Sequence, residues 1–241
     1  MNLQIVIPTA AIVLATVPLA IHIALSPSPP PATVETPPDR PPTETPAVPA
    51  RRYGLEAAVT EVLQTNRCVA CNLSGADLGN RDLSRIDLSK ANLSQTNFND
   101  SKLINAILAQ SNLTQATLQQ AQLQGADLKR ASLERANLSN AELLSASLSQ
   151  ANLSHAILKN AELRDADLTK TRLNHANLQG ASLYGALLQD ADLTGADLSG
   201  ADLRYANLSN ATLTGANLAN ARLDLAILPA DFQGYTGKPE Y

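Results

Sequence analysis

The chain has 241 residues and a formal net charge of -4, and 44% of its residues are hydrophobic although only 3% are aromatic. Aromatic side chains supply much of the core and pocket lining of most enzymes, so their near absence argues against a conventional globular enzyme. The 18 basic residues nearly balance the 22 acidic ones, which leaves no basic footprint for nucleic acid. We therefore expect a protein that is not an enzyme and has no nucleic-acid partner.

Residues 1–25 are typical of a membrane segment. Leu3 to Leu25 is a run of 23 residues without Asp, Glu, Lys or Arg, which at about 1.5 Å per residue spans a bilayer core of about 30 Å. A cleaved signal peptide is the main alternative, but it requires a basic start and small residues before the cleavage site, and neither is well matched. The sequence favours an uncleaved anchor at residues 3–25, with a buried soluble helix as the third alternative.

Residues 26–52 are typical of an extended stalk. They hold ten of the 14 prolines of the chain and little apolar bulk, so the segment cannot bury enough surface to offset the loss of chain entropy. Proline-rich stretches favour the extended polyproline II conformation. We predict a spacer; a ligand for a proline-recognising domain is the less favoured alternative.

Residues 53–70 are predicted to form a capping helix followed by a turn with two cysteines. Gly54 to Arg67 has apolar residues at helical spacing on one side, namely Leu55, Ala58, Val59, Val62 and Leu63. A short amphipathic helix is not stable alone, so we expect it to pack against the start of the segment that follows.

From Leu73 to Leu228 every fifth residue is Leu, in 31 of 32 positions, and Phe98 is the exception. The residue two positions before is Ala in 25 of the 32 cases, and the residue directly before is Asn or Asp in 17. Neither a helix nor a plain strand has this period. A period of five with one large and one small inward residue requires a corner in every pentad, which indicates a solenoid whose coils pack on their neighbours.

Segments such as Ala126–Arg130 (ADLKR) and Ala196–Gly200 (ADLSG) follow the pattern A(D/N)LXX. On these repeats the chain resembles the pentapeptide-repeat family over residues 71–230, in a form with an N-terminal export or anchor segment as in cyanobacteria. The resemblance implies an all-β fold, a right-handed quadrilateral β-helix with four pentads per coil, behind an N-terminal α-helical cap. Thirty-two pentads then make about eight coils, and no cofactor is implied.

The interior of such a rod is predicted from the two inward positions. Each stacked Leu contributes roughly 1.5 to 3 kcal/mol on burial, so the Leu column dominates stability. Arg81 is the exception, a charged residue at an inward position of the first coil, and we expect it to escape under the helix or to meet Asp77 or Asp82. At the other end, residues 231–241 form a tail, and Pro229, Phe232 and Tyr235 are predicted to close the pattern as a cap.

Cys68 and Cys71 lie five residues before Leu73 and Ala76 respectively, so both are expected to point inward at the start of the first coil. They follow the predicted helix rather than precede it, which disfavours a thioredoxin-like site. A zinc site would need further ligands that the sequence does not place nearby. A structural disulfide is favoured because export leads to an oxidising compartment; free buried thiols and redox or metal chemistry are the alternatives.

No catalytic or metal motif is present, and neither a P-loop, G-x-S-x-G nor H-E-x-x-H occurs. His155 and His175 are 20 residues apart and are expected to stack one coil apart, with Arg135 one coil earlier. Two histidines could hold a metal weakly, but an exposed polar ladder is the favoured interpretation. No catalytic, cofactor-binding or metal residue is predicted.

A more informative pattern appears in steps of 20 residues. Apolar, Tyr and Arg side chains recur on one side of the predicted rod, and such residues dominate many protein interfaces. Scatter on an unconstrained surface is the alternative. The predicted interaction face comprises Ile104, Leu144, Arg164, Tyr184, Arg204 and Tyr205, with Gln124 in the same column and Leu225 beside Tyr205.

Two classes of function follow. The first is a non-enzymatic structural or protein-interaction rod displayed from a membrane, in the periplasm or thylakoid lumen, whose partner is another protein or a second copy; a rod facing the cytoplasm is the alternative orientation. The second is the branch of the same family that mimics DNA and binds topoisomerases. Residues 71–230 hold 13 basic and 15 acidic residues, a net charge of -2, which is too small to imitate a phosphate backbone.

Overall fold

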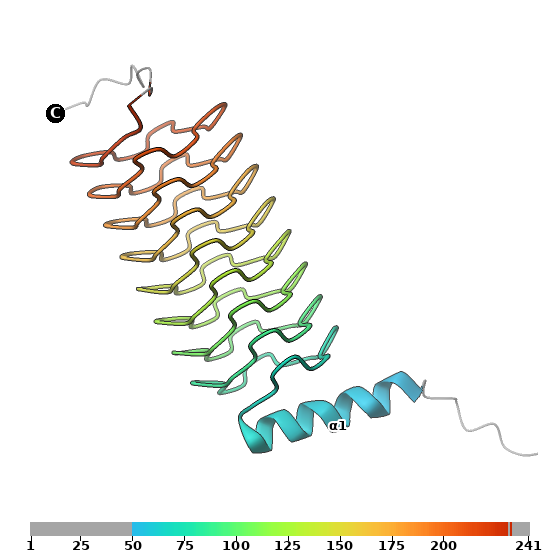
Figure 1. The fold of residues 1–241 in the computed structure, drawn as a ribbon. Coiled ribbons are helices and arrows are strands. Elements are labelled where there is room, and N and C mark those ends of the chain that lie inside the picture. Colours follow the sequence, from blue (N-terminus) through green and yellow to red (C-terminus); the bar gives the residue numbers. More distant parts are fainter. Residues whose placement is uncertain (1–49, 231, 233–241) are drawn as a thin grey trace, which may run out of the picture. The chain divides into compact units, whose positions relative to one another are not determined.

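A computed structural model describes residues 50–230 and residue 232. One helix, α1 (Ala50–Thr65), is followed by a stack of short coils (Figure 1). In the described part of the chain, no helix is both long enough and apolar enough to cross a membrane. The predicted anchor, the stalk up to residue 49, and Tyr235 lie outside the described residues.

Helix α1 begins four residues before the predicted Gly54 and ends two residues before the predicted Arg67. Its end is set by Asn66, which has a φ of 53° and donates its backbone N–H to the Val62 carbonyl at 2.9 Å. Asn is one of the few residues that adopt this left-handed conformation readily, and it commonly terminates helices. Val62 is 2% exposed within the main hydrophobic cluster, and three other apolar residues of α1 pack against that cluster, namely Leu55, Ala58 and Val59.

The coils are defined by parallel backbone bridges between residues 20 positions apart. They run without interruption from Arg67, which pairs with Asp87, to Asn207, which pairs with Ile227. Each bridge is a single residue, so each coil has four one-residue ladder positions joined by turns. The prediction of four pentads per coil is therefore confirmed, and 32 pentads at this period make eight coils.

The turns that open at Leu73 to Leu223 share one φ pattern, and all of them except the one that ends at Arg81 share the same closing hydrogen bond. The residue after the inward Ala, or after the residue in its place, forms the bridge to the neighbouring coils. The Leu that follows is the first of four residues in a turn, which is closed by a hydrogen bond such as that from the Ala126 N–H to the Leu123 carbonyl at 3.0 Å. The third residue of each turn has a positive φ, for example 57° at Arg130 and 65° at Gly125. A single positive φ at this place is the type II arrangement. Non-glycine residues accept it at most corners because the repeat holds them there.

The interior is the column of Leu and Ala that the sequence predicted. From Leu73 to Leu208 the Leu column and Phe98 are at most 1% exposed. Where Thr or Ser replaces Ala, the hydroxyl is satisfied internally, as in Thr96, which donates to the Leu73 carbonyl at 2.8 Å. Arg81, by contrast, has an exposed side chain and forms no ion pair with Asp77 or Asp82. Ala76 and Ile86, at the inward positions on either side of it, are buried, so the exposure is particular to Arg81.

The frequent Asn and Asp before each Leu have a structural role. Their side-chain oxygens accept a hydrogen bond from the backbone N–H two residues later, as Asp127 Oδ1 does from the Lys129 N–H at 3.1 Å. Several also bond to the equivalent residue of an adjacent coil, as Asn97 does by donating from Nδ2 to Asp77 Oδ1 in the preceding coil at 2.7 Å. These residues stabilise the entry to the turn, so their abundance is no sign of a polar active site.

Candidate interaction surface

Cys68 and Cys71 are half-buried, pack against the hydrophobic cluster and are joined by a disulfide, with their Cα atoms 5.5 Å apart. Cys68 donates its backbone N–H to the Asp87 carbonyl at 2.7 Å, and the Cys71 carbonyl accepts from Asn92 at 2.8 Å. The pair thus lies at the junction between α1 and the first coil.

His155 and His175 stack as their spacing predicts, with ring centroids 5.2 Å apart and planes 13° apart. Parallel rings direct their in-plane nitrogen lone pairs side by side rather than toward a common point. Within the described residues, no group of three or more His, Cys, Asp or Glu side chains is placed to hold a metal ion. The pair has the geometry of an exposed ladder.

The predicted interaction face occupies one corner of six successive coils, and we call it, with Tyr205 of the same corner included, the Tyr–Arg column. It runs along the rod through Ile104, Gln124, Leu144, Arg164, Tyr184 and Arg204, each in the residue directly after a buried Leu. Ile104 and Leu144 are half-buried and separated by Gln124, whose amide contacts Glu142. Arg164 is exposed and pairs with Glu162 at 2.8 Å. The N-terminal half of the column is therefore mixed rather than continuously apolar.

The C-terminal half of the column is a connected cluster. The rings of Tyr184 and Tyr205 lie with centroids 5.1 Å apart, and the guanidinium of Arg204 lies 5.4 Å from the Tyr184 ring centroid. Arg204 also donates two bonds to Asp202, from Nε at 2.8 Å and from Nη2 at 2.7 Å. Each side chain is held by a neighbour, so little conformational freedom remains to be lost on binding.

The acidic and basic groups of this cluster shift each other's pKa. The hydrogen bonds from Arg204 hold the pKa of Asp202 below its usual value despite partial burial, and Arg222 at 3.9 Å acts in the same direction. The hydrogen bond to Asp202 raises the pKa of Arg204, and the charge of Asp224 contributes to this rise. Both groups of the Asp202 and Arg204 pair are therefore charged at neutral pH.

The structure adds two apolar residues that the sequence pattern did not single out. Leu187 is 42% exposed and Ile227 is 56% exposed, and both lie in the ladder position around the corner from the Tyr–Arg column. With Tyr184, Tyr205 and Leu225 they form what we call the apolar patch. The position directly before Leu holds Asn or Asp in 17 of 32 pentads. An aliphatic residue at that position departs from the pattern, and this departure could have identified Leu187 and Ile227 from the sequence.

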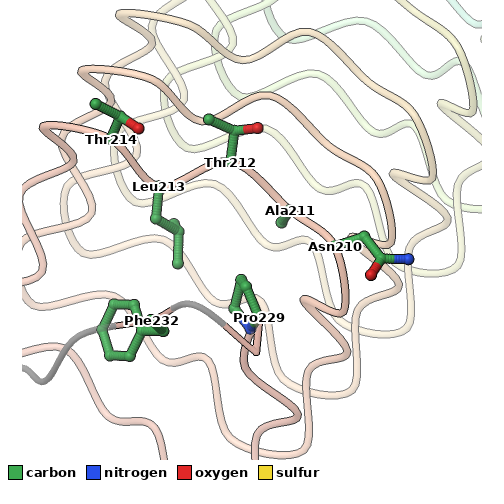
Figure 2. A pocket seen from close by; sticks show the side chains of 7 residues that line it. All are labelled: Asn210, Ala211, Thr212, Leu213, Thr214, Pro229 and Phe232. Carbon is green, nitrogen blue, oxygen red and sulfur yellow. The ribbon is translucent and has the colours of Figure 1, made fainter.

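A hollow of about 410 Å³ lies where the last coil ends (Figure 2). Pro229 and Phe232 line one side of it, below Leu213 and Ala211. Phe232 donates its backbone N–H to the Pro229 carbonyl at 3.1 Å, and Pro229 is buried. These two residues of the predicted C-terminal cap lie over part of the final coil.

With the coils in place, the class of protein can be stated. The chain matches the family model for pentapeptide repeats in eight copies, over residues 71–110, 111–150, 146–185 and 191–228. These matches cover more than half of the chain, and the chain belongs to the pentapeptide-repeat family. Members of this family fold as right-handed quadrilateral β-helices and are generally structural or interaction proteins.

Several solved structures are similar. HetL, a pentapeptide-repeat protein involved in heterocyst differentiation regulation in the cyanobacterium Nostoc sp. strain PCC 7120, is 36% identical over 68% of this chain and 87% of its own, with a TM-score of 0.30. A pentapeptide-repeat protein of the Arabidopsis thaliana thylakoid lumen is 30% identical over 46% and 73%, with a TM-score of 0.27. QnrB1, a plasmid-mediated fluoroquinolone resistance protein, is 20% identical over 65% and 92%, with a TM-score of 0.49. A search of curated proteins finds no match.

Proposed function

We propose that the chain is a non-enzymatic interaction rod that binds a protein partner along the C-terminal half of the Tyr–Arg column. The observation that supports this most directly is the ordered cluster of Tyr184, Arg204 and Tyr205. Tyr and Arg are the residues that most often dominate interface energies, and they do so most when neighbours hold them in place. Tyr205 is 52% exposed and is free to be covered.

The rod is displayed from a membrane in this proposal. Residues 3–25 act as the anchor and residues 26–49 as the spacer, as their composition predicts; the predicted end of the spacer at residue 52 is too late, because helix α1 begins at Ala50. Helix α1 acts as the N-terminal cap, since Val62 covers the first coil, and Pro229 with Phe232 shields part of the last one. Caps of this kind prevent repeat rods from stacking end to end.

The location that fits an exported rod with a disulfide is an oxidising compartment, the periplasm or the thylakoid lumen. Carbonate extraction of membranes followed by N-terminal sequencing tests the anchor. A chain that stays in the membrane and begins at Met1 is the expected result. A soluble chain that begins beyond residue 20 would show a cleaved signal peptide instead.

DNA mimicry is the less favoured function for a charge reason. A rod that imitates DNA must present many unpaired carboxylates, whereas residues 71–230 have a net charge of only -2 and Asp202 on this surface is paired with Arg204 at 2.7 Å.

The interaction proposal is tested with the double variant Tyr184→Glu and Arg204→Glu in the full chain. The expected result is a normal fold with loss of the co-purifying protein, because two charges replace the centre of the surface. The matched control is Asn174→Glu with Thr194→Glu, ten residues earlier in each coil and therefore on the opposite corner, where Glu134 shows that Glu is accepted. If the control loses the partner and the first variant retains it, the assignment of the face is wrong.

A further inference from the structure

Half of the exposed large hydrophobic residues in the described part of the chain, including the three most exposed, lie at one corner near the C-terminal end of the rod; the others, Leu63, Val69, Ile107 and Ile157, are spread over the rest of it. Among the described residues, the large hydrophobic residues that are most exposed are Leu225 at 70%, Ile227 at 56% and Tyr205 at 52%. All three belong to the last two coils and to one corner. Leu187, one coil earlier, is 42% exposed and joins them. Exposed apolar side chains that gather at one corner in this way mark an interaction site.

The backbone connects these residues into one surface. Tyr205 bonds to the coil above through its N–H to the Asp224 carbonyl at 3.1 Å, so Leu225 follows directly over it. Leu187 and Ile227 lie in one ladder on either side of Asn207. The Tyr184 ring closes the patch toward the Tyr–Arg column through its contact with Tyr205.

The charged residues around the apolar patch are of both signs and nearly balance. Asp202, Asp224, Arg204 and Arg222 lie beside its last two coils, and Asp165, Asp167 and Arg164 lie one coil below Gly185, Leu187 and Tyr184. A partner with a strong net charge gains little from such a border. A second copy of the same surface, turned by a two-fold axis, can place its acidic side chains against the basic ones and its basic side chains against the acidic ones.

We propose that two copies of this chain associate side by side through the apolar patch, in a two-fold arrangement in which the borders of Asp202, Arg204, Arg222 and Asp224 face each other. This inference names the partner for the surface that the proposed function assigns, and it rests on that function. The apolar patch and its charged border comprise fewer residues than the about 20 to 30 a side of a standard interface, so we expect the association to be weak in solution. Copies tethered in one membrane meet at a raised effective concentration, which would favour the pair.

The first experiment measures self-association of the purified full chain in detergent by sedimentation over a range of concentrations. Tyr205→Asn and Leu225→Asn remove apolar surface at corners with φ of 60° and 59°, where Asn is well accepted. We expect each to weaken association about tenfold or more. Ile157→Asn is the matched control, since Ile157 is 40% exposed in a ladder on another side of the rod, and it should associate like the parent chain.

The second experiment separates a two-fold pair from any other contact. Arg222→Asp makes its side of the border acidic, and Asp224→Arg makes it basic. Each variant alone should associate more weakly than the parent chain, and a mixture of the two should form the mixed pair, because each acidic border then meets a basic one.

A parent chain that stays monomeric at all concentrations, or variants of the apolar patch that associate like Ile157→Asn, would overturn the proposal. If the chain is monomeric while Tyr184→Glu with Arg204→Glu still abolishes binding of a different protein, self-association is wrong and the proposed interaction function stands. If association depends on the patch but no other protein is bound, the second copy is itself the partner.

Discussion

The interior and the exterior of the rod obey different rules. Inside, the same two positions hold Leu and Ala in coil after coil, and Leu128 is fully buried between equivalent residues of its neighbours. Outside, the residue next to it, Lys129, is exposed, and its column holds residues as different as Ala109, Ser149 and Gln189. The comparison teaches that the fold constrains the inner columns strongly and leaves the outer ones available for function, so a clustered pattern outside carries information.

Removing a mid-rod leucine should have the largest effect. Leu128→Ala loses buried apolar surface and leaves a cavity that the coils above and below cannot fill, which costs about 2 to 5 kcal/mol of unfolding free energy. Lys129→Ala should cost under about 0.5 kcal/mol. Leu223→Ala in the last coil, where Leu223 is only half-buried, should lie between them. Chemical denaturation measures all three, and equal costs would contradict the register.

Loss of the disulfide is expected to have the next largest effect on the unfolding free energy, because it lies at the start of the first coil, where no earlier coil packs against the chain. The chain-entropy relation for a closed loop of four residues gives about 2 kcal/mol, and the loop here joins Cys68 to Cys71. We therefore expect reduction to lower the unfolding free energy of the parent chain by about this amount. The variant Cys68→Ser with Cys71→Ser should show no response to a reducing agent. A parent chain whose mass is unchanged by reduction would show that the thiols are free.

Replacing a glycine at a corner by alanine should have a smaller effect on the unfolding free energy, and it tests how strongly the turns outside the core constrain the sequence. Gly125 and Gly200 have φ of 65° and 67°, so an alanine there pays a left-handed cost of about 1 kcal/mol. At Gly125 the new Cβ would also meet the Oδ1 atom of Asn105, whereas at Gly200 nothing lies within 4 Å. Gly125→Ala should therefore be the more destabilising of the two in thermal or chemical unfolding. The reverse order would mean that Asn105 moves aside freely.

The smallest effect expected is a dependence of stability on acid. Hydrogen bonds hold the pKa values of Asp87 and Asp202 below their usual values, from Ser89 and Arg204 respectively. A lowered pKa in the folded state means that the contribution is present above the unfolded value of about 3.9 and is lost as the pH falls through the folded values. The unfolding free energy should therefore decrease below about pH 4. Asp202→Asn should make that decrease shallower, and an unchanged pH profile would exclude this role of Asp202.

Much of the fold was predictable because the pentad pattern is so regular. The five-residue period, the buried Leu column and the 20-residue coil implied by the family resemblance all match the structure, since no insertion breaks the register between Leu73 and Leu228. The helix was predicted with different bounds because side-chain periodicity does not show where Asn66 turns into the left-handed conformation. The 20-residue coils stack the residues of the predicted interaction face at one corner, and whether this face binds a partner stays a prediction.

The sequence by itself determined the interior of this protein, because a strict repeat assigns every fifth residue to the core regardless of what lies around it. Only the tertiary structure decided which outward residues meet. Leu187 and Ile227 are 40 residues apart and belong to a different column from Tyr184 and Tyr205, and the corner between two ladders brings them into one patch. Contacts between columns depend on turn geometry and on the direction of each side chain, which a count of residues along the chain does not contain.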